Sequence, residues 1–396
     1  MKRQIITISL LILIVLIPII SWLFWYLKPD KPLHVAILDK TVLNKSTQEH
    51  MSLSWVLEHE KYVKDNDEFY NHELDYFGFF PDEEGGYAIK DFNDYEDVQL
   101  DSIADYYDMI AYTDLYGIYV SEWWDAYPER APKEWEYVSP QERRRLIYGS
   151  MTQKEVDLLK KMKSKNKLIF TEFNLFADPT TAAVRHDFEQ SFQMKWTGWA
   201  GKYFHSLDTN RNEEIPWWLK LVYVEQHGEW PFLNSGIVFI RNDQSVVILE
   251  HKTHLQNEVP MIVTEEEYVE KYGVVPEVKY PFWFDICENK WPNKSISHYH
   301  IQTNDLGDSV MRAHHIPRKF PAVIKGGGGY PFYYFAGDYS DNQLSGGSMN
   351  FEKVEWVSSF FYGSVAHERD SFFWKYYRPL TTTIIDDYYK TLNDKR

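Results

Sequence analysis

An uncharged apolar run at the N-terminus limits what this chain can fold into more than any other feature. Residues 5–27 form a stretch of 23 residues without a charge, preceded by the basic start MKRQ. A helix of that length can cross a hydrocarbon core of about 30 Å. The stretch closes with Trp22, Trp25 and Tyr26, which match the aromatic belt at membrane interfaces. A cleaved signal peptide has a shorter apolar region and a small-x-small site, so the run predicts an uncleaved single-pass anchor.

The charges on the two sides of this run differ little, with Lys2 and Arg3 before it and Lys28 and Lys31 after it. A tail of four residues before the run favours a cytoplasmic N-terminus. We therefore expect a cell-membrane protein whose main domain is extracytoplasmic. The chain divides into an anchor, a linker, an α/β domain and a packed aromatic tail, at residues 1–28, 29–33, 34–345 and 346–396.

The composition is globular and argues against two classes of ligand. A net charge of −17 and a pI near 5.3 argue against nucleic acid, because phosphate binding requires a basic surface. The single cysteine, Cys287, excludes an internal disulfide and a two-cysteine metal site. Four histidines lack the spacing of a known metal motif and are interpreted as surface residues: His298, His300, His314 and His315. We expect neither a metal nor a cofactor.

Apolar strands alternate with amphipathic helices through the first half of the chain. The runs LHVAILD, DYFGFFP, YDMIAYTD and KLIFTEF are typical of buried strands and lie at residues 33–39, 75–81, 107–114 and 167–173. Residues 82–101 are acidic and contain glycine, which predicts a surface loop. The alternation predicts a doubly wound, mostly parallel sheet.

Two helix starts carry capping signals. Thr152 and Glu155 have capping-box spacing at the head of TQKEVDLLKKMKSKNK. Asp178 and Pro179 predict an N-cap and a first-turn proline for the next helix. From about residue 220 the pattern changes to hairpins and single strands, at residues 236–250 (with Asn242 and Asp243 in the turn), 295–302 and 326–338. The predicted class is therefore α/β, with β-hairpins added to the sheet and one transmembrane helix before it.

Polar residues follow the strands at the edge where an open parallel sheet binds ligands. Asp39, Asp114, Glu172 and Asp338 each close one of the predicted strands, and Asn174 follows in the turn after LIFTEF. The helix predicted to begin near Pro179 would add free backbone N–H groups beside two threonines, a seat for an anion. The predicted ligand-binding residues are Asp39, Asn174, Thr180, Thr181, Trp123 and Trp199.

Two readings of the acidic residues stay open. Asp114 and Glu172, with Asp338 assisting, are the predicted catalytic residues of a glycoside hydrolase, which needs a general acid and a general base. Aromatic residues make up 17% of the chain, and Phe173, Trp123 and Trp124 are candidates for stacking on sugar rings. The WTGWAGKYF stretch, which contains Trp199, is a candidate lining of a ligand cleft. The alternative is that the acids cap helices and turns while the tryptophans pack in the core or on the sheet edge.

The order of these elements resembles the class I glutamine amidotransferase-like superfamily, nearest to its ThuA-like branch. The resemblance spans roughly residues 33–345 and rests on VAILD, YDMIAYTD, TQKEVDLLKKMKSKNKLIFTEF and GGGGYPFYYFAGD. It implies a flavodoxin-like sheet and a nucleophilic cysteine on the turn after LIFTEF. This chain has Phe173 or Asn174 there, and Cys287 lies in a different context. A glutaminase needs a thiolate, so that activity is not expected.

Two functional hypotheses follow. In the favoured one, the chain is a membrane-anchored, non-catalytic binding or scaffold protein of the bacterial cell envelope, with a degenerate amidotransferase-like domain. Its partners would be the membrane, and envelope polysaccharides or other membrane proteins. In the alternative, it is a carbohydrate-active hydrolase that uses paired carboxylates at the carboxyl ends of the strands.

Overall fold

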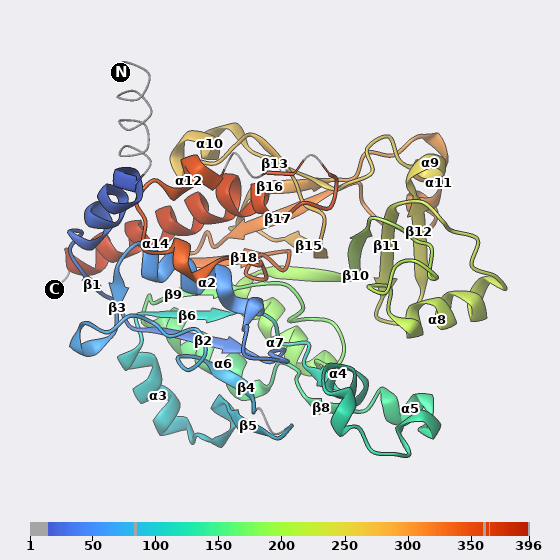
Figure 1. Cartoon of the computed structure of the whole chain (residues 1–396), viewed down its shortest axis with the longest axis horizontal. Coiled ribbons are helices and arrows are strands. Elements are labelled where there is room, and N and C mark those ends of the chain that lie inside the picture. Colours follow the sequence, from blue (N-terminus) through green and yellow to red (C-terminus); the bar gives the residue numbers. More distant parts are fainter. Residues whose placement is uncertain (1–14, 83–84, 359–361, 364, 395–396) are drawn as a thin grey trace, which may run out of the picture.

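The computed structural model describes residues 15–82, 85–358, 362–363 and 365–394. Its centre is a ten-stranded sheet in the order β14-β13-β16-β17-β18-β9-β6-β2-β4-β5 (Figure 1). Five neighbouring strands in it are parallel: β4 (Phe77–Pro81), β2 (Val35–Asp39), β6 (Met109–Tyr112), β9 (Leu168–Thr171) and β18 (Phe332–Phe335). The three strands at the centre of this group, β2, β6 and β9, are buried along their whole length, which is why they read as continuous apolar runs.

The rest of the sheet is antiparallel, so the prediction of a mostly parallel sheet is wrong and the sheet is mixed. β5 (Tyr87–Lys90) pairs with β4 at one end, and the other end is built from β17 (Lys319–Lys325), β16 (Lys294–His300), β13 (Met261–Thr264) and β14 (Glu277–Lys279). The glycine turn at residues 326–329 joins β17 to β18. A connection this short can join only antiparallel neighbours, because a parallel crossover needs a dozen or more residues.

Two layers of helices pack on the parallel strands. In one layer α6 (Gln153–Ser164) contacts both α3 (Asp97–Tyr106) and α7 (Ala182–Phe192). In the other layer α2 (Gln48–His59) contacts α14 (Arg378–Asn393). α6 begins where the sequence predicts, since Thr152 and Glu155 form the full capping box. The predicted loop at residues 82–101 is wrong, because it contains β5 and the start of α3.

A second sheet of four strands has the order β12-β11-β10-β15. β11 (Gly236–Arg241) and β12 (Val246–Glu250) are the predicted hairpin, which is confirmed. β10 (Met194–Phe204) carries the WTGWAGKYF stretch and pairs with β15 (Trp283–Asn289). An isolated bridge between Phe284 and Gly337 connects β15 to the segment after β18. The second sheet therefore borders the carboxyl end of the parallel strands.

The remaining elements are short. The strands are β1 (Lys31–Pro32), β3 (Tyr62–Val63), β7 (Ile118–Tyr119) and β8 (Leu146–Tyr148). The helices are α4 (Val120–Ala126), α5 (Pro140–Arg143), α8 (Trp217–His227), α9 (His251–His254), α10 (Glu266–Tyr272), α11 (Asp305–Ala313), α12 (Val354–Ser358) and α13 (Asp370–Phe372). Single helical turns lie at η1 (Asp65–Asp67), η2 (Phe92–Asp94), η3 (Pro128–Arg130), η4 (Trp135–Tyr137), η5 (Gly346–Ser348) and η7 (Phe373–Tyr377).

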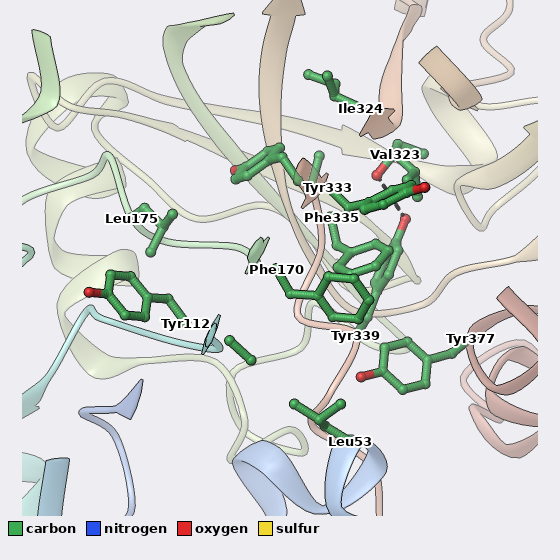
Figure 2. Packing of buried hydrophobic residues seen from close by; sticks show 14 of the residues in the cluster. Leu53, Tyr112, Phe170, Leu175, Val323, Ile324, Tyr333, Phe335, Tyr339 and Tyr377 are labelled. Atoms are coloured by element: carbon green, nitrogen blue, oxygen red, sulfur yellow. Dashed lines mark hydrogen bonds between the residues drawn. The ribbon is translucent and has the colours of Figure 1, made fainter. Parts of the chain in front are cut away.

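The main core is unusually aromatic where the C-terminal tail meets the sheet (Figure 2). Phe170 of β9 packs edge to face on Phe335 of β18, with ring centroids 5.2 Å apart. Leu53 of α2 and Tyr377 of η7 are fully buried in the same cluster. The predicted packed tail therefore contributes directly to the core beneath the carboxyl end of β18.

Residues 15–26 form a helix at the N-terminal end of the described chain. Most of its side chains are apolar and exposed, whereas Trp25 is buried against the domain. Among the residues that the structure describes, no helix is long and apolar enough to cross a membrane. Residues 1–14, which hold much of the predicted anchor, lie outside the described residues.

Candidate functional site

Four carboxyl groups meet at the carboxyl end of the parallel strands. Asp39 ends β2, Asp114 lies two residues after β6, Glu172 directly follows β9 and Asp338 lies three residues after β18. Each side chain is buried, with at most 9% exposure. Burial raises the pKa of Asp114, Glu172 and Asp338, and negative neighbours within the same group raise it further. We call these four residues the carboxyl edge.

The segment after β18 holds the carboxyl group of Glu172. Its Oε2 accepts hydrogen bonds from the N–H groups of Tyr339 (3.1 Å) and Ser340 (2.9 Å), and its Oε1 lies 2.6 Å from the Ser340 hydroxyl. Burial raises the pKa of Glu172 to about 8, although these hydrogen bonds oppose the shift. The side chain is therefore a neutral acid at pH 7, and its hydrogen-bonding atoms are occupied by groups of the same chain.

Asp39 forms a buried pair with His50 of α2. Asp39 Oδ2 lies 2.9 Å from His50 Nδ1, while Asp39 Oδ1 accepts from the N–H and the hydroxyl of Thr41. His50 Nε2 lies 2.8 Å from the carbonyl oxygen of His72. Both ring nitrogens thus face oxygen atoms, but a neutral imidazole has only one N–H. Both contacts are hydrogen bonds at once only if His50 carries a proton on each ring nitrogen or Asp39 carries one.

The turn after β9 places Asn174 where the resemblance implies a nucleophile. Asn174 has φ of 68°, in the left-handed region, and its N–H donates to Asp285 Oδ2 at 3.0 Å. The Asn174 side chain hydrogen-bonds to Asp114, which lowers the pKa of that acid against the larger effect of burial. Asp285 is itself buried, and burial raises its pKa to about 6. The N–H that an oxyanion would need is already occupied.

Cys287 lies closer to this turn than its place in the sequence indicates. The Tyr334 hydroxyl donates to Asp285 Oδ2 at 2.7 Å and lies 3.8 Å from Cys287 Sγ. Cys287 is 1% exposed, and burial raises the pKa of its thiol. A reactive cysteine is a partly exposed thiolate, so Cys287 does not replace the missing nucleophile.

Two cations and two aromatic rings border the carboxyl edge. Lys202 Nζ lies 5.2 and 5.4 Å from the ring centroids of Phe282 and Trp283, and the Arg369 guanidinium lies 3.5 Å from that of Phe282. Trp283 stacks on Phe173 at 6.0 Å. Phe282, Trp283 and Arg369 are half-buried, so this margin is more accessible than the acids themselves.

The two predicted threonines serve local structure. Thr180 is 2% exposed, and its hydroxyl accepts from the N–H of Met151 at 2.9 Å. Thr181 is the N-cap of α7, where its hydroxyl accepts from the N–H of Val184 at 3.5 Å. The prediction of Asp178 as N-cap and Pro179 in the first turn is therefore wrong. The threonine hydroxyl takes the capping position three residues later.

The two predicted tryptophans do not present a stacking face to solvent. Trp123 and Trp199 are each 2% exposed. The Trp123 ring packs edge to face on Phe79 at 5.3 Å, because α4 folds back onto the end of β4. Trp199, on β10, packs against the guanidinium of Arg241 at 5.3 Å. Their prediction as ligand-binding residues is not matched by these positions, and the half-buried Trp283 is the better placed ring.

One histidine on the far part of the sheet lies beside an acidic side chain, and burial lowers the pKa of its ring. His298 Nδ1 lies 2.8 Å from Glu265 Oε1. In the part of the chain that the structure describes, no group of three or more His, Cys, Asp or Glu residues is arranged to hold a metal ion.

Sequence reasoning missed several residues of the site, namely His50, Glu49, Asp285, Ser340, Lys202 and Arg369. His50 has a local signal, because it lies 11 residues after Asp39 and at the start of α2. Glu49 precedes His50 on the same helix, whereas Asp285, Ser340, Lys202 and Arg369 reach the site from segments distant in the sequence. The chain matches no protein-family model, no curated protein and no solved structure. Function is therefore inferred from the carboxyl edge and the N-terminal helix.

Proposed function

We propose that this chain is a membrane-anchored, non-catalytic binding or scaffold protein of the bacterial cell envelope, with envelope glycans as its candidate ligand. The observation that carries the proposal is the state of Glu172. Tyr339 and Ser340 occupy its oxygen atoms, and it lies 2% exposed beside a turn without a nucleophile. A catalytic acid must reach its substrate, whereas this group connects the end of β9 to the segment after β18.

The strand order supports a degenerate amidotransferase-like domain. The parallel strands lie in the order β4-β2-β6-β9-β18, which is 2-1-3-4-5 in chain order and matches a flavodoxin-like sheet. In such a sheet the ligand lies where the winding reverses, here between β2 and β6. Asp39 and Asp114 follow those two strands. Asn174 occupies the turn after β9, and its side-chain amide cannot replace a thiolate.

The exposed surface of the N-terminal helix supports the membrane anchor. Val15, Ile17, Ile19 and Ile20 are each between 46% and 61% exposed. The apolar sequence continues without a charge back to residue 5. Side chains of this kind are stable in lipid and costly in water, so a bilayer around residues 5–24 accounts for their exposure.

One observation favours the alternative of a carbohydrate-active hydrolase. The pKa of Glu172 is raised to about 8, mainly by burial, and Asp338 lies within electrostatic reach of both Glu172 and Asp114. A neutral acid beside other carboxyl groups is the pattern of glycoside hydrolysis. Opening of the segment around Ser340 would then be needed to expose Glu172.

The test uses the full chain in lipid nanodiscs with a panel of envelope polysaccharides, and follows bound glycan and released reducing ends together. Glu172→Gln is compared with the wild type and with Glu129→Gln, which changes an exposed carboxyl. Binding without release, equal in all three proteins, is the expected result. Release that is lost only in Glu172→Gln would establish the hydrolase instead. If no glycan binds, the glycan ligand is excluded and membrane proteins become the partners to test.

A further inference from the structure

The base of the N-terminal helix is fixed to the domain. Trp25 is 5% exposed, and its indole N–H donates to the carbonyl oxygen of His59 at 3.1 Å. The ammonium of Lys61 lies 4.5 Å from the centroid of the Trp25 ring. Lys28 forms an ion pair with Glu352 at 2.6 Å. The helix is therefore held at its base, so its direction relative to the domain is set.

The contact with the domain ends at Ser21. The Ser21 hydroxyl donates to the carbonyl oxygen of Glu352 at 2.6 Å, and the Glu352 N–H donates to the Ser21 carbonyl oxygen at 3.3 Å. Ser21 lies about 6 Å along the helix from Trp25, since each residue rises about 1.5 Å. The residues before Ser21 are apolar and exposed. The contact with Glu352 therefore marks the point on the helix before which its apolar side chains are exposed.

α12 starts two residues after Glu352 and has two different faces. Val354 packs on the main core, and Glu355 Oε2 lies 3.7 Å from Arg378 Nη2. Lys353, Trp356 and Val357 are all exposed, Trp356 by 69% and Val357 by 53%. Trp356 and Val357 are neighbours on α12, and Lys353 directly precedes the helix with φ of 61°, in the left-handed region. α12 and the helix at residues 15–26 both lie on the upper side of the molecule in Figure 1.

This combination of side chains suits the boundary between lipid and water. Tryptophan and lysine are enriched at that boundary, where the indole ring lies among headgroups and the lysine ammonium extends to water. The N-terminal helix also presents two aromatic rings next to Ser21, since Trp22 and Tyr26 are exposed and stack at 5.2 Å. We propose that α12 is a second membrane contact, with Trp356 and Val357 in the headgroup region of the bilayer that holds the anchor. The inference rests on the proposed membrane anchor.

A second contact would fix the orientation of the domain relative to the membrane. With the anchor helix as its one contact, the domain can tilt with that helix relative to the bilayer, and a contact at α12 limits this tilt. Interfacial segments of this kind bury an apolar face a few ångströms into the headgroup layer. The carboxyl edge would then be held at a constant height and direction above the bilayer.

The test places single nitroxide labels on the full chain in lipid vesicles and measures collision with oxygen and with a water-soluble nickel complex. Cys287 is 1% exposed, so the parent chain should take up no label and serves as the blank. Ile20→Cys reports the anchor, and Trp356→Cys and Val357→Cys report α12. Tyr137→Cys, at a site 85% exposed in the segment between α4 and α5, reports bulk water.

The expected oxygen-to-nickel collision ratio at residues 356 and 357 lies between the high ratio at residue 20 and the low ratio at residue 137. A ratio at 356 and 357 equal to that at 137, with residue 20 in lipid, would overturn the second contact and leave the anchor intact. A low ratio at residue 20 would overturn the anchor itself, and the inference with it. Both α12 positions are exposed, so substitution there leaves the core untouched.

Discussion

The ammonium of Lys40 lies 2.5 Å from Oε1 of Glu155, and both side chains are fully buried. Lys40 directly follows β2, and Glu155 belongs to the capping box of α6. Lys40 also donates to the carbonyl oxygen of Ser150 at 2.9 Å. The ion pair therefore connects the end of β2 to the start of α6. Asp39, at the same strand end, contacts α2 in the other helix layer. The ion pair neutralises one positive and one negative charge next to a site rich in acids.

Breaking this pair should be costly, because an unpaired buried charge remains. Lys40→Met is expected to lower the free energy of unfolding by about 3–5 kcal/mol, measured by denaturant titration. The double variant Lys40→Met/Glu155→Gln removes both charges, and glutamine keeps the capping-box geometry. It should be clearly more stable than Lys40→Met alone. Equal stability of the single and double variants would show that the charge pair is not the cause.

Glu172 should make the protein less stable as pH rises. Its pKa in the folded chain is raised to about 8 from an ordinary value of 4.5, mainly by burial. Between these values the folded state binds a proton that the unfolded state has lost. The contribution of Glu172 to the free energy of unfolding is therefore fully present below about pH 4.5. It declines up to about pH 8, by about 1.4 kcal/mol per pH unit for one proton.

Glu172→Gln tests this dependence while keeping the contacts. The glutamine oxygen can accept from Tyr339 and Ser340, and its amide can donate to the Ser340 hydroxyl, which in turn lies 2.9 Å from the Tyr377 hydroxyl. The variant should fold and show a flatter decline of unfolding free energy between pH 5 and 8, whereas Glu129→Gln should match the wild type. Parallel curves for wild type and Glu172→Gln would contradict a neutral Glu172.

The N-cap of α7 is Thr181 in the structure, whereas the sequence predicts Asp178, and substitutions can distinguish the two. Thr181→Ala should lower the unfolding free energy by about 1 kcal/mol, because the N-cap hydroxyl is lost. Thr181→Ser should restore most of it. Asp178→Ala should change stability little, since Asp178 is exposed and lies outside the helix. A larger loss for Asp178→Ala than for Thr181→Ala would return the cap to Asp178.

Local signals account for the parts of the fold that sequence predicted well. The capping box of Thr152 and Glu155 depends on residues three apart, and the apolar runs of β2, β6 and β9 are legible because both faces of each strand are buried. Parallel neighbours end at the same edge, so the meeting of Asp39 with Asp114 and Glu172 follows from the strand order. These inferences need no knowledge of distant segments.

Distant partners account for what sequence could not predict. Asp285 reaches the turn at Asn174 from 111 residues away, and Ser340 reaches Glu172 from 168 residues away. Neither segment carries a motif that names its partner. β5 was missed for another reason: all four of its residues are exposed, so the edge strand lacks the apolar alternation that marks a strand. The burial of Trp123 could not be predicted either, because a tryptophan has the same sequence signature in a core and in a sugar-binding site.

The contacts around His50 predict which of its ring nitrogens carry a proton. Asp39 Oδ1 already accepts from the N–H and the hydroxyl of Thr41, so this oxygen acts as an acceptor in both contacts. The extra proton is therefore expected on His50, which then donates from Nδ1 to Asp39 and from Nε2 to the carbonyl oxygen of His72. Nitrogen-15 NMR of histidine-labelled chain should show both His50 ring nitrogens protonated, with His50→Gln to assign the signals.

Asp39→Asn gives the matched control for that assignment. The asparagine oxygen can keep both bonds from Thr41, and its amide can donate to His50 Nδ1, so a neutral imidazole with a proton on Nε2 satisfies every contact. The Nδ1 signal should move to that of an unprotonated ring nitrogen while the Nε2 signal stays. If Nδ1 is already unprotonated in the wild type, the proton belongs to Asp39, and Asp39 joins Glu172 among the neutral acids of the carboxyl edge.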